Sequence, residues 1–165
     1  MSLPPGLEDY WEQHVEETRA YWSRVCAKNG IDPSTKPDVF PWSTTPILAD
    51  LWLNLILHGG KRSTGHPMLQ HEVESTAPHV VGDYSIVLDG FARPACVIQT
   101  TSVEIKAFRD VDEAFVKAES EGGGILTYWK VGHWASYEDY CVMHDATMSE
   151  ELPMVCEYFE LIDPS

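Results

Sequence analysis

Apolar and polar positions recur with two different periods along the chain, which divides it into helical and extended segments. Residues 7 to 29 carry apolar side chains at three- and four-residue steps with acidic residues between them, and this spacing predicts a helix that ends at Asn29-Gly30. The next stretch, residues 31 to 42, has three prolines and no periodicity. We expect a connector there, whose two large aromatic residues, Phe40 and Trp42, dock it onto the body of the protein.

A second helix is predicted to begin at Thr45-Pro46, because a threonine hydroxyl caps a helix and proline fits its first position. The apolar pattern continues to Ile56, and the pair Gly59-Gly60 marks the end. Apolar residues occur on nearly every side of this helix. The pattern therefore predicts a helix that is buried all round.

From residue 80 onward the pattern is mainly that of strands. Residues 84 to 89 and 94 to 101 are rich in β-branched side chains and flank the turn Asp89-Gly90, which predicts a hairpin. Three later segments complete the prediction: helices over 110 to 121 and 125 to 142, separated by a run of three glycines, and a closing strand over 153 to 162. Because no strand-helix-strand alternation occurs, the predicted class is α+β with a mainly antiparallel sheet or small β-barrel.

Composition places the chain among ordinary globular proteins, since 44% of its 165 residues are hydrophobic. No apolar run approaches the roughly 20 residues that span a bilayer, and no basic segment precedes an apolar one at the N-terminus. We therefore expect a cytoplasmic protein without a membrane partner. The charge is strongly negative, because 11 Lys and Arg against 26 Asp and Glu give −15. It is also uneven: residues 51 to 71 contain Lys61 and Arg62 and no acid, whereas acids accumulate after Lys130 without any cation.

Cysteine and histidine spacing gives little sign of a metal centre. The four cysteines are widely separated and form no C-x-x-C pair, so we expect buried free thiols. Four histidines, His66, His71, His133 and His144, are numerous enough to suggest a metal site, but no H-E-x-x-H motif or similar spacing occurs. We expect neither a metal nor a cofactor.

One loop motif connects the chain to a known family. The stretch from Gly59 to Thr64 reads G-G-K-R-S-T and fits the signature G-x-K-x-x-[T/E/S]. Further matches follow in the expected order: V-G-D-Y at 81–84, I-Q-T-T-S-V at 98–103, A-E-S-E-G at 118–122, H-W at 133–134 and P-M-V-C-E at 153–157. On these residues the chain resembles ASCH domains, small β-barrel proteins related to the PUA fold, and is most similar to a longer bacterial subgroup. The resemblance implies an N-terminal helix and proline-rich connector packed on the body over residues 1–45, and an ASCH domain over residues 46–165.

Two activities follow from the resemblance, and each implies its own residues. A compact branch of the family removes an acyl group from N4-acetylcytidine, and its pattern implies catalytic roles for Lys61, Thr64 and Glu121, with Glu119 as an alternative to Glu121. Lys61 would activate the Thr64 hydroxyl if burial removes its charge, and Glu121 would pass the proton to the leaving amine. If Lys61 and Glu121 are both charged, they form an ion pair that holds substrate without chemistry.

A longer branch cleaves single-stranded RNA with the same lysine and a later serine, which corresponds to Ser136. The tyrosine that this branch places shortly before the lysine has no counterpart in residues 54 to 57. Substrate contacts are expected from the signature loop and this serine, namely from Gly60, Arg62, Ser63 and Ser136.

Simpler structural explanations exist for the same residues. Thr64 could cap a loop, Lys61 could be a solvated charge, Glu121 could end a helix and Ser136 could be a surface hydroxyl, while most aromatic side chains belong to the core. The expected function is a hydrolase or binding protein for a modified nucleoside or short single-stranded RNA. The alternatives are a metal-independent ribonuclease and a non-catalytic RNA- or nucleotide-binding module. The charge of −15 favours a small ligand, because a long nucleic acid duplex would be repelled.

Overall fold

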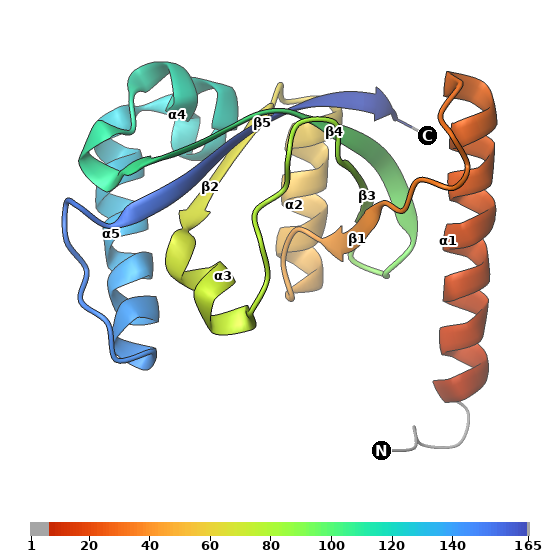
Figure 1. The fold of residues 1–165 in the computed structure, drawn as a ribbon, viewed down its shortest axis with the longest axis horizontal. Helices are drawn as coiled ribbons and strands as arrows, with labels where there is room; N and C mark the ends of the chain where they lie inside the picture. Colours follow the sequence, from red (N-terminus) through yellow and green to blue (C-terminus); the bar gives the residue numbers. More distant parts are fainter. Residues whose placement is uncertain (1–6, 165) are drawn as a thin grey trace. The chain divides into compact units, whose positions relative to one another are not determined.

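The computed structural model describes residues 7–164, which fold into helices and one sheet (Figure 1). The α-helices are α1 (Leu7–Asn29), α2 (Pro46–Leu57), α3 (Met68–Glu74), α4 (Glu113–Glu119) and α5 (Leu126–Met143), and the short 3₁₀ helices are η1 (Phe108–Asp110) and η2 (Glu121–Gly124). The strands are β1 (Asp38–Pro41), β2 (Ser63–Pro67), β3 (Tyr84–Leu88), β4 (Pro94–Ala107) and β5 (Pro153–Asp163).

The five strands form one sheet in the order β1-β3-β4-β5-β2. β3 and β4 form the predicted antiparallel hairpin, β2 is antiparallel to β5, and β1 runs parallel to β3. The predicted α+β class with mainly antiparallel strands is therefore confirmed. β2 lies at one end of the strand order. The backbone N–H and C=O groups on its outer edge therefore need hydrogen-bond partners other than a neighbouring strand.

The chain divides into two compact units, each with its own core. The first contains α1, β1, α2, β3 and the N-terminal part of β4. Its core forms where one stripe of α1 packs on the hairpin: Tyr21, Trp22, Val25 and Cys26 contact Ile86 and Val97. The three- and four-residue spacing that predicted α1 therefore marks the face that the helix buries.

The second unit holds β2, α3, the C-terminal part of β4, η1, α4, η2, α5 and most of β5. Its core is largely aromatic: Phe108 stacks on Trp129 with ring centroids 5.6 Å apart, and Phe115 meets Trp129 edge to face. Tyr137 and Cys141 of α5 belong to the same cluster. The expectation that most aromatic residues are core residues is met only in part, because Phe91 and Tyr128 are each 68% exposed. All four cysteines are buried free thiols, as predicted.

Three features differ from the sequence-based expectations. The connector contains a strand, β1, which pairs with β3, and the segment after Gly59-Gly60 continues as β2 and α3 rather than as a loop. The expectation that α2 is buried all round is wrong. Only its stripe of Ala49, Leu53 and Ile56 is buried, whereas Ile47 is 79% exposed. High overall apolarity therefore did not mean burial on every side, because only one stripe of a helix can face β3. No helix in residues 7–164 has the length and apolar character needed to cross a membrane.

Candidate functional site

The signature loop leads directly into the edge strand β2, and side chains close the outer edge of that strand. Lys61 Nζ donates to the carbonyl of Ser63 at 3.0 Å, and the amide of Gly65 donates to Glu119 Oε1 at 3.0 Å. The Tyr137 hydroxyl donates to the carbonyl of Gly65 at 2.9 Å. These side chains satisfy backbone groups that an edge strand leaves without a ladder partner. Lys61, Glu119 and Tyr137 therefore have a structural role whatever their chemistry.

Lys61 is fully buried, with an exposed fraction of 0%, so it is not a solvated charge. Besides the Ser63 carbonyl, its Nζ donates to the carbonyl of Glu119 at 3.4 Å and to Glu121 Oε1 at 2.6 Å. Three acceptors require three N–H groups, which only the ammonium form supplies. The geometry thus favours the state in which Lys61 and Glu121 form an ion pair. Glu121 itself is reached by solvent, because its side chain is 17% exposed.

Glu119 is the other carboxyl of the A-E-S-E-G stretch and is 1% exposed. Its Oε2 accepts a hydrogen bond from Trp129 Nε1, in addition to the bond that Oε1 accepts from Gly65. The pKa of Glu119 is raised from 4.5 to about 7, mainly by burial. The positive charge of Lys61 opposes this rise, and the negative charge of Glu121 adds to it. At neutral pH this carboxyl is therefore present in both protonation states.

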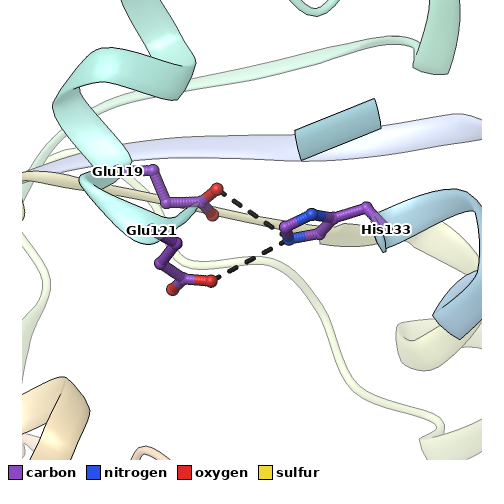
Figure 2. Close-up of side chains that lie close together, drawn as sticks. All are labelled: Glu119, Glu121 and His133. Atoms are coloured by element: carbon purple, nitrogen blue, oxygen red, sulfur yellow. Dashed lines mark ion pairs between the residues drawn. The ribbon is translucent and has the colours of Figure 1, made fainter. Parts of the chain in front are cut away.

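His133 completes the cluster from α5. Figure 2 shows Glu119 and Glu121 pointing toward its imidazole, and Nε2 lies 3.9 Å from Glu119 Oε2 and 3.9 Å from Glu121 Oε2. The other ring nitrogen, Nδ1, lies 3.0 Å from the carbonyl of Trp129, and the ring stacks on the Trp129 indole at 4.0 Å. Burial lowers the pKa of His133, which favours the neutral imidazole.

Glu119, Glu121 and His133 carry potential metal-ligand atoms that lie within 4.8 Å of one another, and among the side chains described for residues 14–164 this is the one group of three His, Cys, Asp or Glu residues with that spacing. It differs from the histidine set that the sequence suggested. His66 and His71 contact each other through their Nε2 atoms at 2.8 Å, and His144 is exposed at the end of α5. Within the cluster, the ammonium of Lys61 already supplies a cation to Glu121.

The remaining predicted residues lie around this cluster in different ways. Ser63 is buried and its hydroxyl donates to the carbonyl of Phe115 at 2.9 Å. Because side chains alternate along a strand, Thr64 lies on the opposite face of β2 from Ser63. No hydrogen bond joins Thr64 to Lys61 or Glu121 among the described contacts. The structure therefore joins Lys61 to Glu121 and shows no described hydrogen bond from Thr64 to either of them.

The three other predicted contact residues are placed as follows. Arg62 is half-buried and donates from a guanidinium nitrogen to the carbonyl of Lys61 at 2.6 Å, so it braces the loop. Gly60 is exposed and has a φ of +77°, a conformation that glycine adopts without strain. Ser136 is exposed on α5, three residues after His133.

The face of β2 that carries Thr64 has its own polar cluster. Glu157, which lies opposite Thr64 on β5, accepts a hydrogen bond from the Thr100 hydroxyl at 2.6 Å and pairs with His79 Nδ1 at 3.1 Å. His66 lies two residues after Thr64 on β2, and burial lowers its pKa from 6.5 to about 4. At neutral pH His66 is therefore uncharged.

Sequence reasoning did not bring three residues that line the cluster into the predicted site: Trp129 and Tyr137 were assigned to the core, and His133 was named only among four histidines and in the H-W match. They follow one another at four-residue steps on α5, so they share one face of the helix. The signal that could have identified them is the polar atom that each of these large side chains carries, because buried Trp, His and Tyr groups need hydrogen-bond partners. A helix stripe of this kind predicts a polar interior site rather than only a core.

Comparison with known proteins identifies the family to which this fold and cluster belong. The family model for the ASCH domain matches residues 38–163. The chain belongs to the ASCH domain family. Solved structures of ASCH relatives support the same fold: a protein of Enterococcus faecalis V583 described as family DUF984 has 26% identity and a TM-score of 0.80, with 90% of each chain covered. The ASCH domain from Lactobacillus crispatus JV V101 has 20% identity and a TM-score of 0.80, covering 90% of this chain and 95% of that one. No curated protein matches this chain.

These findings confirm the resemblance to ASCH domains and the PUA-like fold class. Membership of the ASCH family supports RNA binding or a related function, without indicating a particular substrate. The Lys61–Glu121 pair, the A-E-S-E-G segment and the face of α5 all lie within the matched residues.

Proposed function

We propose that this ASCH protein hydrolyses the acyl amide of a modified cytosine nucleoside of the N4-acetylcytidine type. The observation that carries the proposal is the ion pair between Lys61 and Glu121, at 2.6 Å. These two residues are 60 positions apart in the sequence, and both match positions for which the family resemblance implies catalytic roles. Their meeting in one buried cluster supports a shared site.

The chemistry divides among the members of this cluster. Lys61 has no exposed surface, so it acts by holding the carboxylate of Glu121 and by neutralising its charge. Glu121 is partly exposed and is the group that faces a bound substrate. Glu119, with a pKa of about 7, supplies a carboxyl that both gives and accepts a proton near neutral pH. Such a set suits amide hydrolysis, where the leaving nitrogen must be protonated.

The overall charge also supports a nucleoside rather than a polymer. With a formal charge of −15, the protein repels a polyanion, and the cation nearest the cluster, Lys61, is already paired. A nucleoside carries no phosphate and avoids this repulsion. We expect its binding to change little with salt concentration, whereas binding through several phosphates would weaken steeply.

The test is hydrolysis of N4-acetylcytidine, followed by chromatographic detection of cytidine in buffer with EDTA. We expect turnover by the unmodified protein and a loss of at least about 100-fold in kcat/KM for Glu121→Gln. The matched control is Glu138→Gln, which changes an exposed glutamate on α5 and should retain full activity. Absence of cytidine would overturn the proposal. Degradation of short single-stranded RNA in EDTA that is abolished by Lys61→Ala would favour a metal-independent ribonuclease instead.

A second candidate, a non-catalytic RNA- or nucleotide-binding module, is favoured by the edge of β2. Lys61, Glu119 and Tyr137 each satisfy a backbone group there, which explains their burial without any reaction. In this case a nucleoside or short RNA binds without turnover, and Glu121→Gln leaves affinity nearly unchanged. Titration of both ligands at two salt concentrations distinguishes this candidate from the hydrolase.

A further inference from the structure

The proposed hydrolysis needs a base to activate a nucleophile, and Lys61, to which the family resemblance assigns that role, is placed as a hydrogen-bond donor instead. Lys61 donates three hydrogen bonds and so has no lone pair to accept a proton. Thr64, the nucleophile that the resemblance implies, makes no hydrogen bond to Lys61 or Glu121 among the described contacts, so neither of them is seen as a base beside its hydroxyl. We propose that His133 is the general base of this site and takes a proton from the water molecule that attacks the acyl group. This inference rests on the proposed function and adds a residue to it.

The hydrogen bonding of His133 fixes which nitrogen is the base. Nδ1 lies 3.0 Å from the carbonyl of Trp129, and a carbonyl oxygen only accepts hydrogen bonds. Nδ1 must therefore carry the proton, and in the neutral ring the lone pair is on Nε2. That nitrogen is the one that points toward Glu119 and Glu121 (Figure 2). The backbone of α5 thus holds the imidazole in the tautomer that a general base requires.

The position of Nε2 suits a reacting water. Its distance to one oxygen of Glu119 and one of Glu121 is 3.9 Å in each case, too long for a hydrogen bond but short enough for one water oxygen to contact Nε2 and a carboxylate together. Packing keeps the ring there, because it stacks on Trp129 with an interplanar angle of 17° and meets Tyr137 edge to face at 5.4 Å. The side chain is still 21% exposed, so substrate can reach it.

Burial is the main reason that the pKa of His133 lies below its ordinary value, and two nearby charges act on this pKa in opposite directions. Burial lowers its pKa most, the negative charge of Glu121 raises it, and the positive charge of Lys61 lowers it. Glu119, which also faces the ring, has a pKa raised to about 7. The environment therefore shifts the imidazole toward its basic form and the carboxyl toward its acid form. Opposite shifts of this kind in neighbouring groups are typical of a base and an acid in one active site.

The reaction balances with His133 and one water molecule, and it needs no net proton from Glu119 or Glu121. Nε2 of His133 takes a proton from water while the water oxygen forms a bond to the acyl carbon, and the carbonyl π electrons move to the oxygen. When the tetrahedral intermediate collapses, the bond between the acyl carbon and N4 breaks and its electron pair stays on N4. The imidazolium returns its proton to N4. The products are a carboxylic acid and the free amine of cytidine, and His133 is regenerated as the neutral base.

The test compares His133→Gln with His144→Gln in the N4-acetylcytidine assay with EDTA, across pH 4.5 to 9. His144 is an exposed histidine that caps the C-terminal end of α5, the helix that carries His133, and it serves as the control. We expect His133→Gln to lower kcat by at least about 100-fold and to remove the acid limb of the pH profile, whose midpoint in the unmodified protein lies below 6.5. His144→Gln should leave both unchanged. Circular dichroism checks that each variant is folded.

A second measurement needs no variant and no substrate. In ¹⁵N-histidine NMR of the unmodified protein at pH 7.5, His133 should show a protonated Nδ1 and an unprotonated Nε2. The opposite tautomer overturns the inference even if His133→Gln does not fold.

Three activity results have distinct meanings. If the unmodified protein forms no cytidine, the proposed function fails. If it forms cytidine and folded His133→Gln retains at least half of the rate, only the role of His133 fails. Activity that EDTA abolishes and Mn²⁺ restores also overturns that role, because Nε2 would then hold a metal ion with Glu119 and Glu121.

Discussion

The buried carboxyl of Glu119 makes the stability of this protein depend on pH in a way that Glu119→Gln should reveal. Its pKa in the folded protein is about 7, against an ordinary value of 4.5. Below pH 4.5 the carboxyl is protonated in both the folded and the unfolded chain. Between about pH 4.5 and 7 the unfolded chain loses this proton while the folded protein keeps it, so the free energy of unfolding falls as pH rises. Above pH 7 the contribution of Glu119 is constant.

The magnitude follows from the size of the shift. Each pKa unit corresponds to about 1.4 kcal/mol, so the change from 4.5 to about 7 removes roughly 3 kcal/mol across this window. A glutamine has no titrating proton and escapes that loss. Its amide oxygen can accept from Gly65 or from Trp129 but not from both, which costs about 1–2 kcal/mol at every pH. The difference in stability between variant and parent should therefore shift by about 3 kcal/mol in favour of the variant from pH 4.5 to 7.5.

Urea unfolding followed by tryptophan fluorescence at pH 4.5, 6 and 7.5 measures this difference. Comparing variant with parent is essential, because His66 titrates in an overlapping window with the opposite sign, and its contribution cancels in the difference. Glu138→Gln, at an exposed position, is the control for replacing a glutamate at the surface. If the Glu119→Gln difference stays constant within about 1 kcal/mol, the carboxyl is not held at a raised pKa and its place in the acid-base chemistry fails.

Three further predictions concern the same edge strand. Lys61→Met should lower the free energy of unfolding by about 3 kcal/mol, because it leaves a carboxylate and two carbonyls without their shared donor; a loss below about 1 kcal/mol in urea unfolding would refute this. Tyr137→Phe should cost about 2 kcal/mol by the same assay, since the carbonyl of Gly65 loses its hydrogen bond in a buried position, whereas an unchanged midpoint would show that solvent replaces it. His66→Gln should protect against acid: the folded pKa of about 4 lies below 6.5, so the parent loses roughly 3 kcal/mol as pH falls from 6.5 to 4, and an identical acid-unfolding midpoint in the variant would contradict the prediction.

The helices and the hairpin could be predicted because their local patterns agree with their packing. In the C-terminal half of α1 the apolar positions from Tyr21 to Cys26 are buried, whereas the side chains of residues 7–13 lie outside the described part of the chain. The turn at Asp89-Gly90 joins β3 and β4 as expected. β1 and β2 could not be predicted in the same way. Each is only four or five residues long, and each is held by a partner distant in sequence, β3 and β5 respectively. For such strands, long-range pairing outweighs local preference.

The site was predictable as a motif but not as a geometry. Lys61 and Glu121 came from the family pattern, and the structure joins them. The direction of the Thr64 side chain could not be predicted, because it depends on whether residues 63 and 64 belong to a loop or to a strand. In a strand, neighbouring side chains point to opposite faces of the sheet. His133 lacked any ligand or catalytic motif in the sequence, so its relation to Glu119 and Glu121 could only emerge once α5 was packed against α4 and η2.

Some side chains of this site both stabilise the fold and belong to the proposed reaction, so the choice of residues to substitute matters. Lys61 and Glu119 both donate to or accept from the backbone at the edge of β2. Lys61 also pairs with Glu121, and Glu119 also carries a proton that titrates near neutral pH. Loss of activity after substituting either residue could therefore come from unfolding or from lost chemistry. Glu121 and His133 make no contact with the β2 backbone among the described hydrogen bonds, and both are partly exposed. His133→Gln removes a reacting group while leaving the edge closed, whereas Glu121→Gln also removes the negative charge that pairs with the buried ammonium of Lys61 and should itself cost stability. A loss of turnover in folded His133→Gln, with a urea midpoint near that of the parent, would therefore identify the chemistry, and a matching loss of stability would point back to the binding module.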